Sequence, residues 1–412
     1  MNFIKRPKSV ILNLFLVFFL FVLKPNVFAE NILKGRVTEE ETEIPVPFAS
    51  VFLINTTLGI TADKNGQFSL SIPDGQYDVI VRMLGYEPVT FTVNTNSLPA
   101  KGYKIQLLTS DQELEQVEVE RERDPVWYKN FEKFKELFFG TSKNGRAVSI
   151  ENEEDLILDS ETVPNLLQAQ ARNILKLDNP NLGYELEFSL EEFRYDIENK
   201  TIYYKGYPFF IPYKDLSLSK EKKIEKNRDA AYQGSLQHFI HSLYQGNSID
   251  EGFIIKRIIK IPNPEKPTKK QFEEARSIFR TIKSQIIRDS IQINVLSKAD
   301  LEDEIEKVEE AELDPETLLI RNEDGRVLLK YKDQFQVTYT REPMAREYPR
   351  TIGTQNKKNQ ISKVTISVPD LEIFFSGTAD DPFGLLVEGY MAWERVGDLM
   401  PWDYVPIKSS NQ

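Results

Sequence analysis

Cysteine is absent from this chain of 412 residues, and histidine occurs only as His238 and His241. The absence of cysteine excludes a disulfide framework, a thiol nucleophile, zinc–thiolate sites and a lipid-modified N-terminal cysteine. With no third imidazole, metal binding by these histidines is disfavoured. Both fall away from the centre of the apolar stripe of their expected helix, so we expect solvated surface histidines rather than metal ligands.

Phosphate-binding and nucleophile motifs are also missing. The chain contains neither Gly-x-x-x-x-Gly-Lys nor Gly-x-Gly-x-x-Gly. Gly234-Ser235 lies inside a predicted helix and lacks the second glycine of a nucleophile elbow. His238 follows three residues later, but no acid stands in a recognisable pattern to orient it. The sequence therefore predicts no catalytic, cofactor-binding or metal-ligating residue, and no cofactor.

Basic residues are in the minority, because 52 Lys and Arg face 64 Asp and Glu. The formal net charge is −12, and no basic patch with interleaved aromatics offsets it. Such a surface repels the phosphate backbone, so nucleic acid is excluded as a partner.

Long apolar runs are confined to the N-terminus, where "VILNLFLVFFLFVL" follows the basic residues Lys5, Arg6 and Lys8. Val27 and Ala29 occupy the small-residue positions before a cleavage site, so residues 1–29 are predicted to be a signal peptide. The alternative is an uncleaved anchor, but about 14 apolar residues cover only about 21 Å of a roughly 30 Å hydrocarbon layer. We expect an exported protein, periplasmic or outer-membrane associated, without a transmembrane helix after signal cleavage.

Residues from Ile32 to Leu108 show strand alternation with turn signals about ten residues apart, typical of an antiparallel sandwich. Phe68 lies on one face of such a strand. Asn65-Gly66 and Asp74-Gly75 are the tight turns, because both pairs tolerate positive φ. The segment that begins at Asp63 is interpreted as a turn and not as a calcium loop, because a strand begins at once after it.

This stretch resembles the carboxypeptidase regulatory-like domain of Bacteroidota envelope proteins, a prealbumin-like seven-stranded β-sandwich. The resemblance rests on Gly35, "PVPFASVFL", "LGITADKNGQFSL" and Gly85-Tyr86, in that order. It implies a small adhesive or structural module over residues 30–109. Zinc carboxypeptidase activity is nevertheless excluded, because that metal needs His-x-x-Glu and a distant histidine, and His241 is followed three residues later by Tyr244.

Residues 110–125 are predicted to be a linker, and residues 126–412 a larger, uncharacterised α+β domain of antiparallel strands and amphipathic helices. The fold class is thus β-rich α+β. Helices are expected over 127–139, with an aromatic stripe used for packing, over 219–244 and over 266–287. Residues 253–261 are expected to form a strand, and the acidic run 301–315 a solvated helix or a loose connector.

Nearly the whole expected mature chain resembles a Bacteroidota group in which the sandwich module precedes an uncharacterised C-terminal region. The strings "NPNLGYELEFSLEEFRYD" and "GYMAWERVGDLMPWDYVP" carry that resemblance. It implies an architecture but no chemistry.

Two further clusters could recognise a ligand. Asp380 and Asp381 are adjacent carboxylates, and we interpret them as turn residues. The strand-like segment 201–210 is rich in aromatics that would first pack a core and could alternatively form a protein-binding or glycan-stacking face. Those aromatics are Tyr203, Tyr204, Tyr207, Phe209 and Phe210.

The export signal, the familiar module and the missing catalytic groups together predict a non-enzymatic cell-envelope protein. It would be a binding or structural module that recognises another envelope protein or a glycan. The alternative is a glycan-active hydrolase with unidentified carboxylates, which two carboxylates about 5–9 Å apart in a cleft would support.

Overall fold

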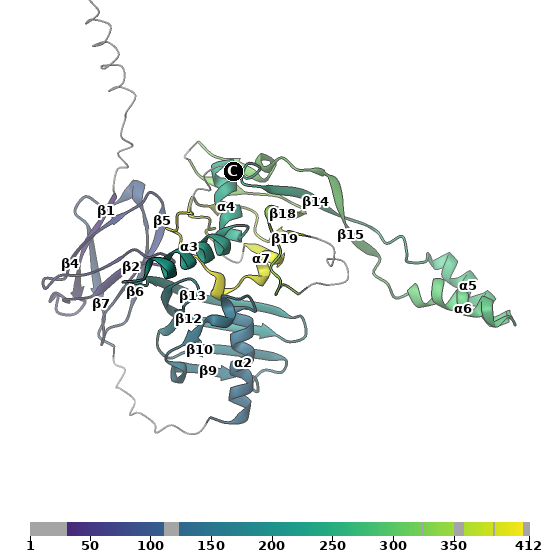
Figure 1. Ribbon diagram of the computed structural model, residues 1–412, viewed down its shortest axis with the longest axis horizontal. Helices are drawn as coiled ribbons and strands as arrows, with labels where there is room; N and C mark the ends of the chain where they lie inside the picture. The colour runs from purple at the N-terminus through teal and green to yellow at the C-terminus, as the bar shows by residue number, and fades with distance from the viewer. Residues whose placement is uncertain (1–30, 111–122, 324, 350–357, 382–383, 407–412) are drawn as a thin grey trace, which may run out of the picture.

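The computed structural model describes residues 31–110, 123–323, 325–349, 358–381 and 384–406 (Figure 1). The predicted signal peptide and most of the predicted linker lie outside these ranges. The described parts comprise an N-terminal β-sandwich, a larger mixed region beside it, and an arm that projects from the larger region (Figure 1).

The N-terminal part is the predicted sandwich, except that its first and last strands pair in parallel and not antiparallel as expected. One sheet has the order β4 (Gln67–Ile72), β1 (Asn31–Glu39), β7 (Tyr103–Leu107), and the other β3 (Gly59–Thr61), β2 (Ser50–Leu53), β5 (Gln76–Arg82), β6 (Val89–Asn94). The turn before β4 is confirmed, since Oδ1 of Asp63 accepts the backbone N–H groups of Asn65 and Gln67, both over 2.8 Å. Gly66 has φ +70°, and a Cβ there would lie 2.3 Å from the carbonyl oxygen of Val37, so glycine is required.

A six-stranded sheet follows the sandwich, and one helix covers it. The strands are β8 (Ser149–Ile150), β9 (Leu156–Asp159), β10 (Leu166–Ala171), β11 (Leu175–Asn179), β12 (Tyr184–Asp196) and β13 (Thr201–Pro212). Helix α2 (Pro125–Phe139) begins at its N-cap Asp124 and buries Phe131, Phe134 and Phe138 against the sheet. The ring of Phe138 meets that of Phe188 edge-on at 5.2 Å. The predicted packing role of this aromatic stripe is confirmed for its three phenylalanines.

A third group of strands and helices completes the chain. One sheet has the order β15 (Glu304–Glu312), β14 (Phe253–Pro262), β18 (Gln334–Pro343), β19 (Asn359–Ile366), β21 (Leu385–Gly389), and a smaller one the order β16 (Leu319–Arg321), β17 (Val327–Leu329), β20 (Leu371–Ile373). The helices are α3 (Leu218–Tyr232), α4 (Leu236–Gln245), α5 (Lys269–Thr281), α6 (Gln285–Asn294) and α7 (Tyr390–Trp393). Short 3-10 turns are η1 (Thr95–Ser97), η2 (Gly145–Ala147), η3 (Glu153–Asp155), η4 (Leu296–Lys298), η5 (Pro315–Leu318) and η6 (Val396–Asp398).

The prediction of one long helix over 219–244 is wrong, because α3 ends at Tyr232 and α4 starts at Leu236. Gly234 separates them with φ +80°. A Cβ at Gly234 would lie 2.1 Å from Oε1 of Gln360, so the chain must pass β19 closely at a residue without a side chain. Ser235 is therefore not inside a helix, since it is the N-cap of α4 and accepts the N–H of His238 over 3.2 Å.

The prediction for residues 301–315 is also wrong, because they contain the strand β15 and not a helix or a loose connector. β15 pairs antiparallel with β14, the strand correctly predicted over 253–261. Ile258 lies opposite Val308, and Lys260 lies opposite Glu306. Cross-strand pairs of opposite charge and of β-branched residues favour this pairing over an isolated acidic helix. The helix predicted over 266–287 is likewise two helices, α5 and α6, which lie between β14 and β15.

Candidate functional site

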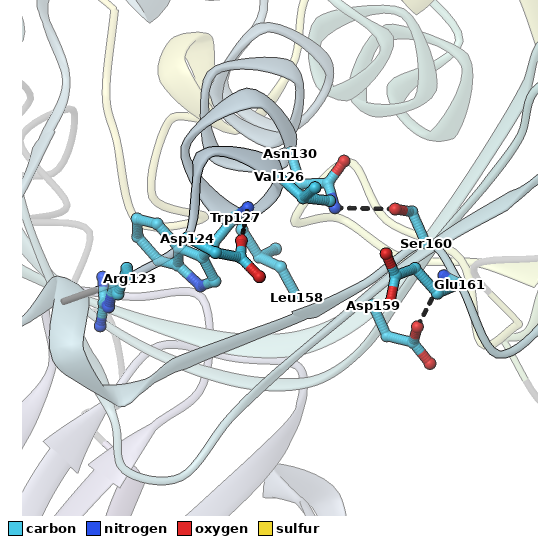
Figure 2. A pocket seen from close by; sticks show the side chains of 9 residues that line it. All are labelled: Arg123, Asp124, Val126, Trp127, Asn130, Leu158, Asp159, Ser160 and Glu161. Atoms are coloured by element: carbon cyan, nitrogen blue, oxygen red, sulfur yellow. Dashed lines mark hydrogen bonds between the residues drawn. The ribbon is translucent and has the colours of Figure 1, made fainter. Parts of the chain in front are cut away.

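A pocket of about 270 Å³ lies where the start of α2 meets the end of β9 (Figure 2). The helix begins there because the Asp124 side chain caps it, accepting the N–H of Trp127 over 2.7 Å, and because Pro125 occupies the first turn. The pocket is lined by Arg123, Asp124, Val126, Trp127, Asn130, Leu158, Asp159, Ser160 and Glu161.

Polar side chains from the helix and the sheet meet across this pocket. Asn130 on α2 donates through Nδ2 to Oγ of Ser160 over 2.8 Å and so joins the helix to the turn after β9 (Figure 2). Oδ1 of Asp159 accepts the backbone N–H groups of Glu161 and Thr162, and these bonds lower the pKa of the Asp159 carboxyl below its usual value. The pocket thus holds Asp159 as a carboxylate, whose Oδ2 takes no part in these two bonds.

The indole of Trp127 lines the pocket with both of its faces covered. The guanidinium carbon of Arg123 lies 3.6 Å from a ring centroid of the indole, and the Phe131 ring stacks at 4.8 Å with an interplanar angle of 18°. Arg123 and Phe131 stand four residues before and four residues after Trp127, so they approach the indole from its two sides. Trp127 therefore offers a ligand its edge and not a stacking platform.

A second pocket, of about 570 Å³, lies near the β12–β13 turn. It is lined by Leu166, Glu192, Arg194, Asp196, Thr201 and Tyr203. Arg194 and Glu192 form an ion pair across it. Because a single sheet provides all of its lining, this pocket has no second element to enclose a ligand, and we regard the α2–β9 pocket as the candidate site.

The other aromatics of segment 201–210 do not form a recognition face. Tyr204 and Phe210 pack in the core beneath α2. Tyr207 and Phe209 pack against the sandwich, where the rings of Phe209 and Phe52 lie 4.4 Å apart. Of the five aromatics, Tyr203 lines a pocket and the other four pack against protein. The alternative of a stacking face is therefore wrong for those four.

The prediction that His238 is a surface histidine is wrong, because only 3% of the residue is exposed. Its Nδ1 accepts the backbone N–H of Gly234 over 3.1 Å, so Nε2 carries the proton and faces Oε2 of Glu251 at 3.5 Å. Burial lowers the pKa of His238 to about 3, so the ring is neutral. Helical periodicity missed this because the rings that cover His238 come from outside α4, namely those of Tyr232, Phe253 and Tyr339.

His241 is partly exposed and contacts the backbone of Phe375. Within the ranges that the structure describes, no group of three or more His, Asp or Glu side chains is arranged to hold a metal ion.

Three carboxyl groups with raised pKa values lie together where β18 meets the C-terminal segment. Burial raises the pKa of Glu342 to about 7, that of Asp398 to about 6, and that of Glu394 well above its usual range. Charge repulsion from Asp398 and Glu342 adds to the shift at Glu394. Asp398 is held by Asn144, whose Nδ2 donates to its Oδ1 over 3.0 Å. None of these carboxyls lines either pocket.

Asp380 is a turn residue, as predicted. Its Oδ1 accepts the backbone N–H groups of Glu372, over 3.0 Å, and of Asp381, over 2.9 Å. In the described parts of the chain we find no helix with both the length and the apolar character needed to cross a membrane.

Comparison with known proteins finds a family model that matches the N-terminal part of the chain. Residues 33–119 match the model of the CarboxypepD_reg-like domain, the same domain that the sequence of the sandwich resembles. No curated protein matches the chain.

Solved structures from Bacteroides resemble the chain weakly. A candidate carbohydrate-binding protein from Bacteroides uniformis shares 11% identity with a TM-score of 0.15; the match covers 38% of this chain and spans only 57% of that protein. A DUF3823 family protein from Bacteroides ovatus shares 10% identity with a TM-score of 0.16, covering 45% and 81% of the two chains. A candidate membrane-associated protein of unknown function from Bacteroides fragilis shares 12% identity with a TM-score of 0.15, covering 84% and 94%.

Proposed function

We propose that the chain is a non-catalytic glycan-binding protein of the bacterial cell envelope, and that the α2–β9 pocket is its sugar site. The observation that carries the proposal is that planar polar side chains from the start of α2 and the end of β9 line one pocket together with the indole of Trp127 (Figure 2). Carboxylates, amides and guanidinium groups each offer two or more hydrogen-bonding atoms in one plane. Adjacent hydroxyls of a sugar ring match such groups, and an apolar ligand does not.

The charge of the lining narrows the class of sugar. Asp124, Asp159 and Glu161 place three carboxylates around the pocket, and Arg123 is the one basic residue of its lining. An acidic sugar would meet net repulsion there, whereas a neutral or amino sugar would not. The volume of about 270 Å³ lies near the lower bound of about 300 Å³ for small-molecule pockets, which favours one terminal sugar unit over a long enclosed chain.

We favour binding without hydrolysis because the carboxyl groups with raised pKa values do not line the pocket. A glycosidase needs one carboxyl with a raised pKa beside the sugar and a second carboxylate at a fixed separation. Here Glu342, Glu394 and Asp398 have raised pKa values, but they belong to another part of the fold. In the pocket, Asp159 has a lowered pKa, opposite to what a general acid requires.

Glycan-array binding followed by titration calorimetry tests the proposal. We expect neutral or amino sugars to bind, and the double variant Arg123→Ala/Glu161→Ala to lower their affinity at least about 10-fold, because two ligand hydrogen bonds are lost. The matched control Glu154→Ala/Arg172→Ala removes the same charges outside the pocket lining and should leave the affinity unchanged.

Two results would contradict the proposal. Equal loss of affinity in both double variants would place the sugar elsewhere. Release of reducing ends from a bound glycan, abolished by Glu161→Ala, would assign a hydrolase instead.

A further inference from the structure

The arm formed by β14, α5, α6 and β15 projects away from the rest of the molecule (Figure 1). β14 pairs with β18 only as far as Ile258, while its pairing with β15 continues to Pro262. The two-stranded stalk thus leaves the sheet and carries the helical pair α5–α6 at its end. We call residues 269–298 the tip.

The tip exposes apolar side chains that a two-helix unit cannot cover. Ala275 is the one residue of α5 and α6 that is fully buried. Ile286 is 83% exposed and Ile293 is 64% exposed. These two lie seven residues apart on α6, which is two helical turns, so they share one outward face. Helices of this length gain little stability alone in water, so covering that face would stabilise them.

The charge of the tip is opposite to that of the whole chain. The tip contains seven Lys and Arg against three Asp and Glu, a net charge of +4, while the chain as a whole has −12. The basic residues are Lys269, Lys270, Arg276, Arg280, Lys283, Arg288 and Lys298. The side-chain charges of the two stalk strands nearly cancel, because Lys256, Arg257, Lys260 and Lys307 stand against five Glu of β15. The segments that join the stalk to the tip add Lys266 against Glu265, Asp300, Glu302 and Asp303. The positive charge is therefore confined to the helical pair itself, with acidic residues at its base.

We propose that the tip docks on an anionic lipid surface. Amphipathic helices that expose aliphatic side chains and carry surrounding Lys and Arg bind in the plane of the membrane interface. Lys and Arg are drawn to anionic headgroups within a Debye length. The acidic remainder of the protein is repelled by the same headgroups, and the stalk holds it at a distance. The positive tip is therefore attracted to the anionic headgroups, whereas a wholly acidic arm would be repelled by them.

A second copy of the chain fits the tip less well. Helix–helix association needs apolar residues repeated every three to four positions along a continuous seam. Between Ile286 and Ile293 the outward face carries the polar residues Asp289 and Ser290, so this face of α6 has no such seam. Isolated aliphatic side chains separated by polar ones can each insert between lipid headgroups, and cannot interlock with a partner helix.

Vesicle flotation tests the proposal. The experiment uses the processed protein, whose N-terminus is determined by mass spectrometry, and unilamellar vesicles of phosphatidylglycerol and phosphatidylethanolamine. We expect flotation with these vesicles and at least about 10-fold less with phosphatidylcholine. Ile286→Asp/Ile293→Asp should lower flotation at least about 10-fold. Leu218→Asp/Ile249→Asp adds the same charge at exposed apolar positions of the body, 76% and 66% exposed, and should float as the wild type does.

A second pair of variants isolates the charge. Arg276→Gln/Arg280→Gln/Lys283→Gln should weaken binding and its salt dependence, while Lys222→Gln/Lys223→Gln/Lys226→Gln on α3 should not. Equal flotation of the tip and body variants would overturn the proposal. A change in oligomeric state of the Ile286/Ile293 variant by sedimentation, with unchanged flotation, would also overturn it and assign the tip to a second copy. Sugar binding is measured on the same proteins and should be unaffected.

Discussion

Asp403, near the C-terminal end of the described residues, binds Thr57 in the N-terminal sandwich. Oδ1 of Asp403 accepts the backbone N–H of Thr57 over 2.9 Å, and its Oδ2 accepts the Thr57 hydroxyl. The neighbouring Trp402 donates its backbone N–H to the carbonyl oxygen of Asn55 over 2.8 Å. The C-terminal segment therefore clamps the first module to the rest of the chain.

The same C-terminal segment also contacts the six-stranded sheet covered by α2 and the helix α4. Trp393 donates its Nε1 proton to Thr141 beside α2 over 2.8 Å, and Asn179 donates through Nδ2 to the carbonyl oxygen of Gly397 over 2.9 Å. Gln237 on α4 donates to the carbonyl oxygen of Pro401 over 3.3 Å. One segment thus fixes the sandwich, α2 and α4 against one another.

Asp403→Ala should destabilise the protein by about 2 kcal/mol, because two hydrogen bonds to a charged acceptor are lost in a partly buried place. Urea unfolding followed by circular dichroism measures the change. Asp300→Ala, at an exposed position, is the control and should leave the midpoint in place. An Asp403→Ala midpoint equal to the wild type would show that the clamp contributes nothing.

Phe209→Ala should let the sandwich unfold separately from the rest of the molecule. The apolar contact between Phe209 and Phe52, supported by the Arg82–Glu187 ion pair, joins the two parts. Removing a packed phenyl ring costs about 2–4 kcal/mol and leaves a gap at this contact. Calorimetry should then resolve two transitions where the wild type shows one.

Phe375→Ala is the control for that experiment, because the half-exposed ring of Phe375 packs on His241 and Tyr244 of α4 and not at the Phe52–Phe209 contact. It should retain the single transition of the wild type. A single transition in both variants would mean that the hydrogen bonds of the clamp suffice to couple the two parts.

Local sequence patterns predicted the sandwich well, because its turns depend on residues that stand next to each other. Gly66 is confined by its own turn, and Asp63 caps residues two and four positions ahead. The helix expected over 127–139 begins two residues earlier, at Pro125, because the side chain of Asp124 caps it. The Asn130–Ser160 contact of the candidate pocket was not predicted, because it joins positions thirty residues apart.

The errors have the same origin. Helical periodicity across Gly234 assumed one continuous helix, but Gly234 adopts φ +80° where the chain passes close to Tyr339 on β18 and Gln360 on β19. The acidic run at β15 resembles a solvated helix until β14 provides Lys260 opposite Glu306. In both cases a strand distant in sequence decided the local conformation, and no alternation within the segment itself records that partner.

His238→Gln should reduce the acid sensitivity of the fold. The folded-state pKa of His238 is about 3 and its ordinary value is 6.5, so the unfolded chain takes up the proton first. The stability that the neutral His238 ring contributes is complete above pH 6.5. It is lost as the pH falls from 6.5 toward 3, by up to about 1.4 kcal/mol per pH unit. Urea unfolding at pH 7, 6, 5 and 4 should show a shallower decline for the variant. His241→Gln should flatten the decline to a smaller extent, because burial lowers the pKa of that partly exposed ring too. Identical slopes in all three proteins would refute the buried neutral ring.

Glu342→Gln should stabilise the protein at alkaline pH and not at acidic pH. The pKa of Glu342 in the folded state is about 7, above its ordinary value of 4.5, so the native protein holds the proton more tightly than the unfolded chain. The stability that this carboxyl contributes is complete below pH 4.5 and is lost as the pH rises toward 7, by up to about 3 kcal/mol in total. A glutamine side chain cannot ionise, so the variant should lack this loss. Glu347→Gln, at an exposed position nearby, controls for the removed charge and should follow the wild type at every pH.

Because Glu342 also repels Glu394, the Glu342→Gln variant should lower the pKa of the Glu394 carboxyl. Infrared difference spectroscopy can follow this titration through the C=O band of the protonated carboxyl. An unchanged Glu394 titration beside an unchanged stability profile would mean that the two carboxyls do not interact.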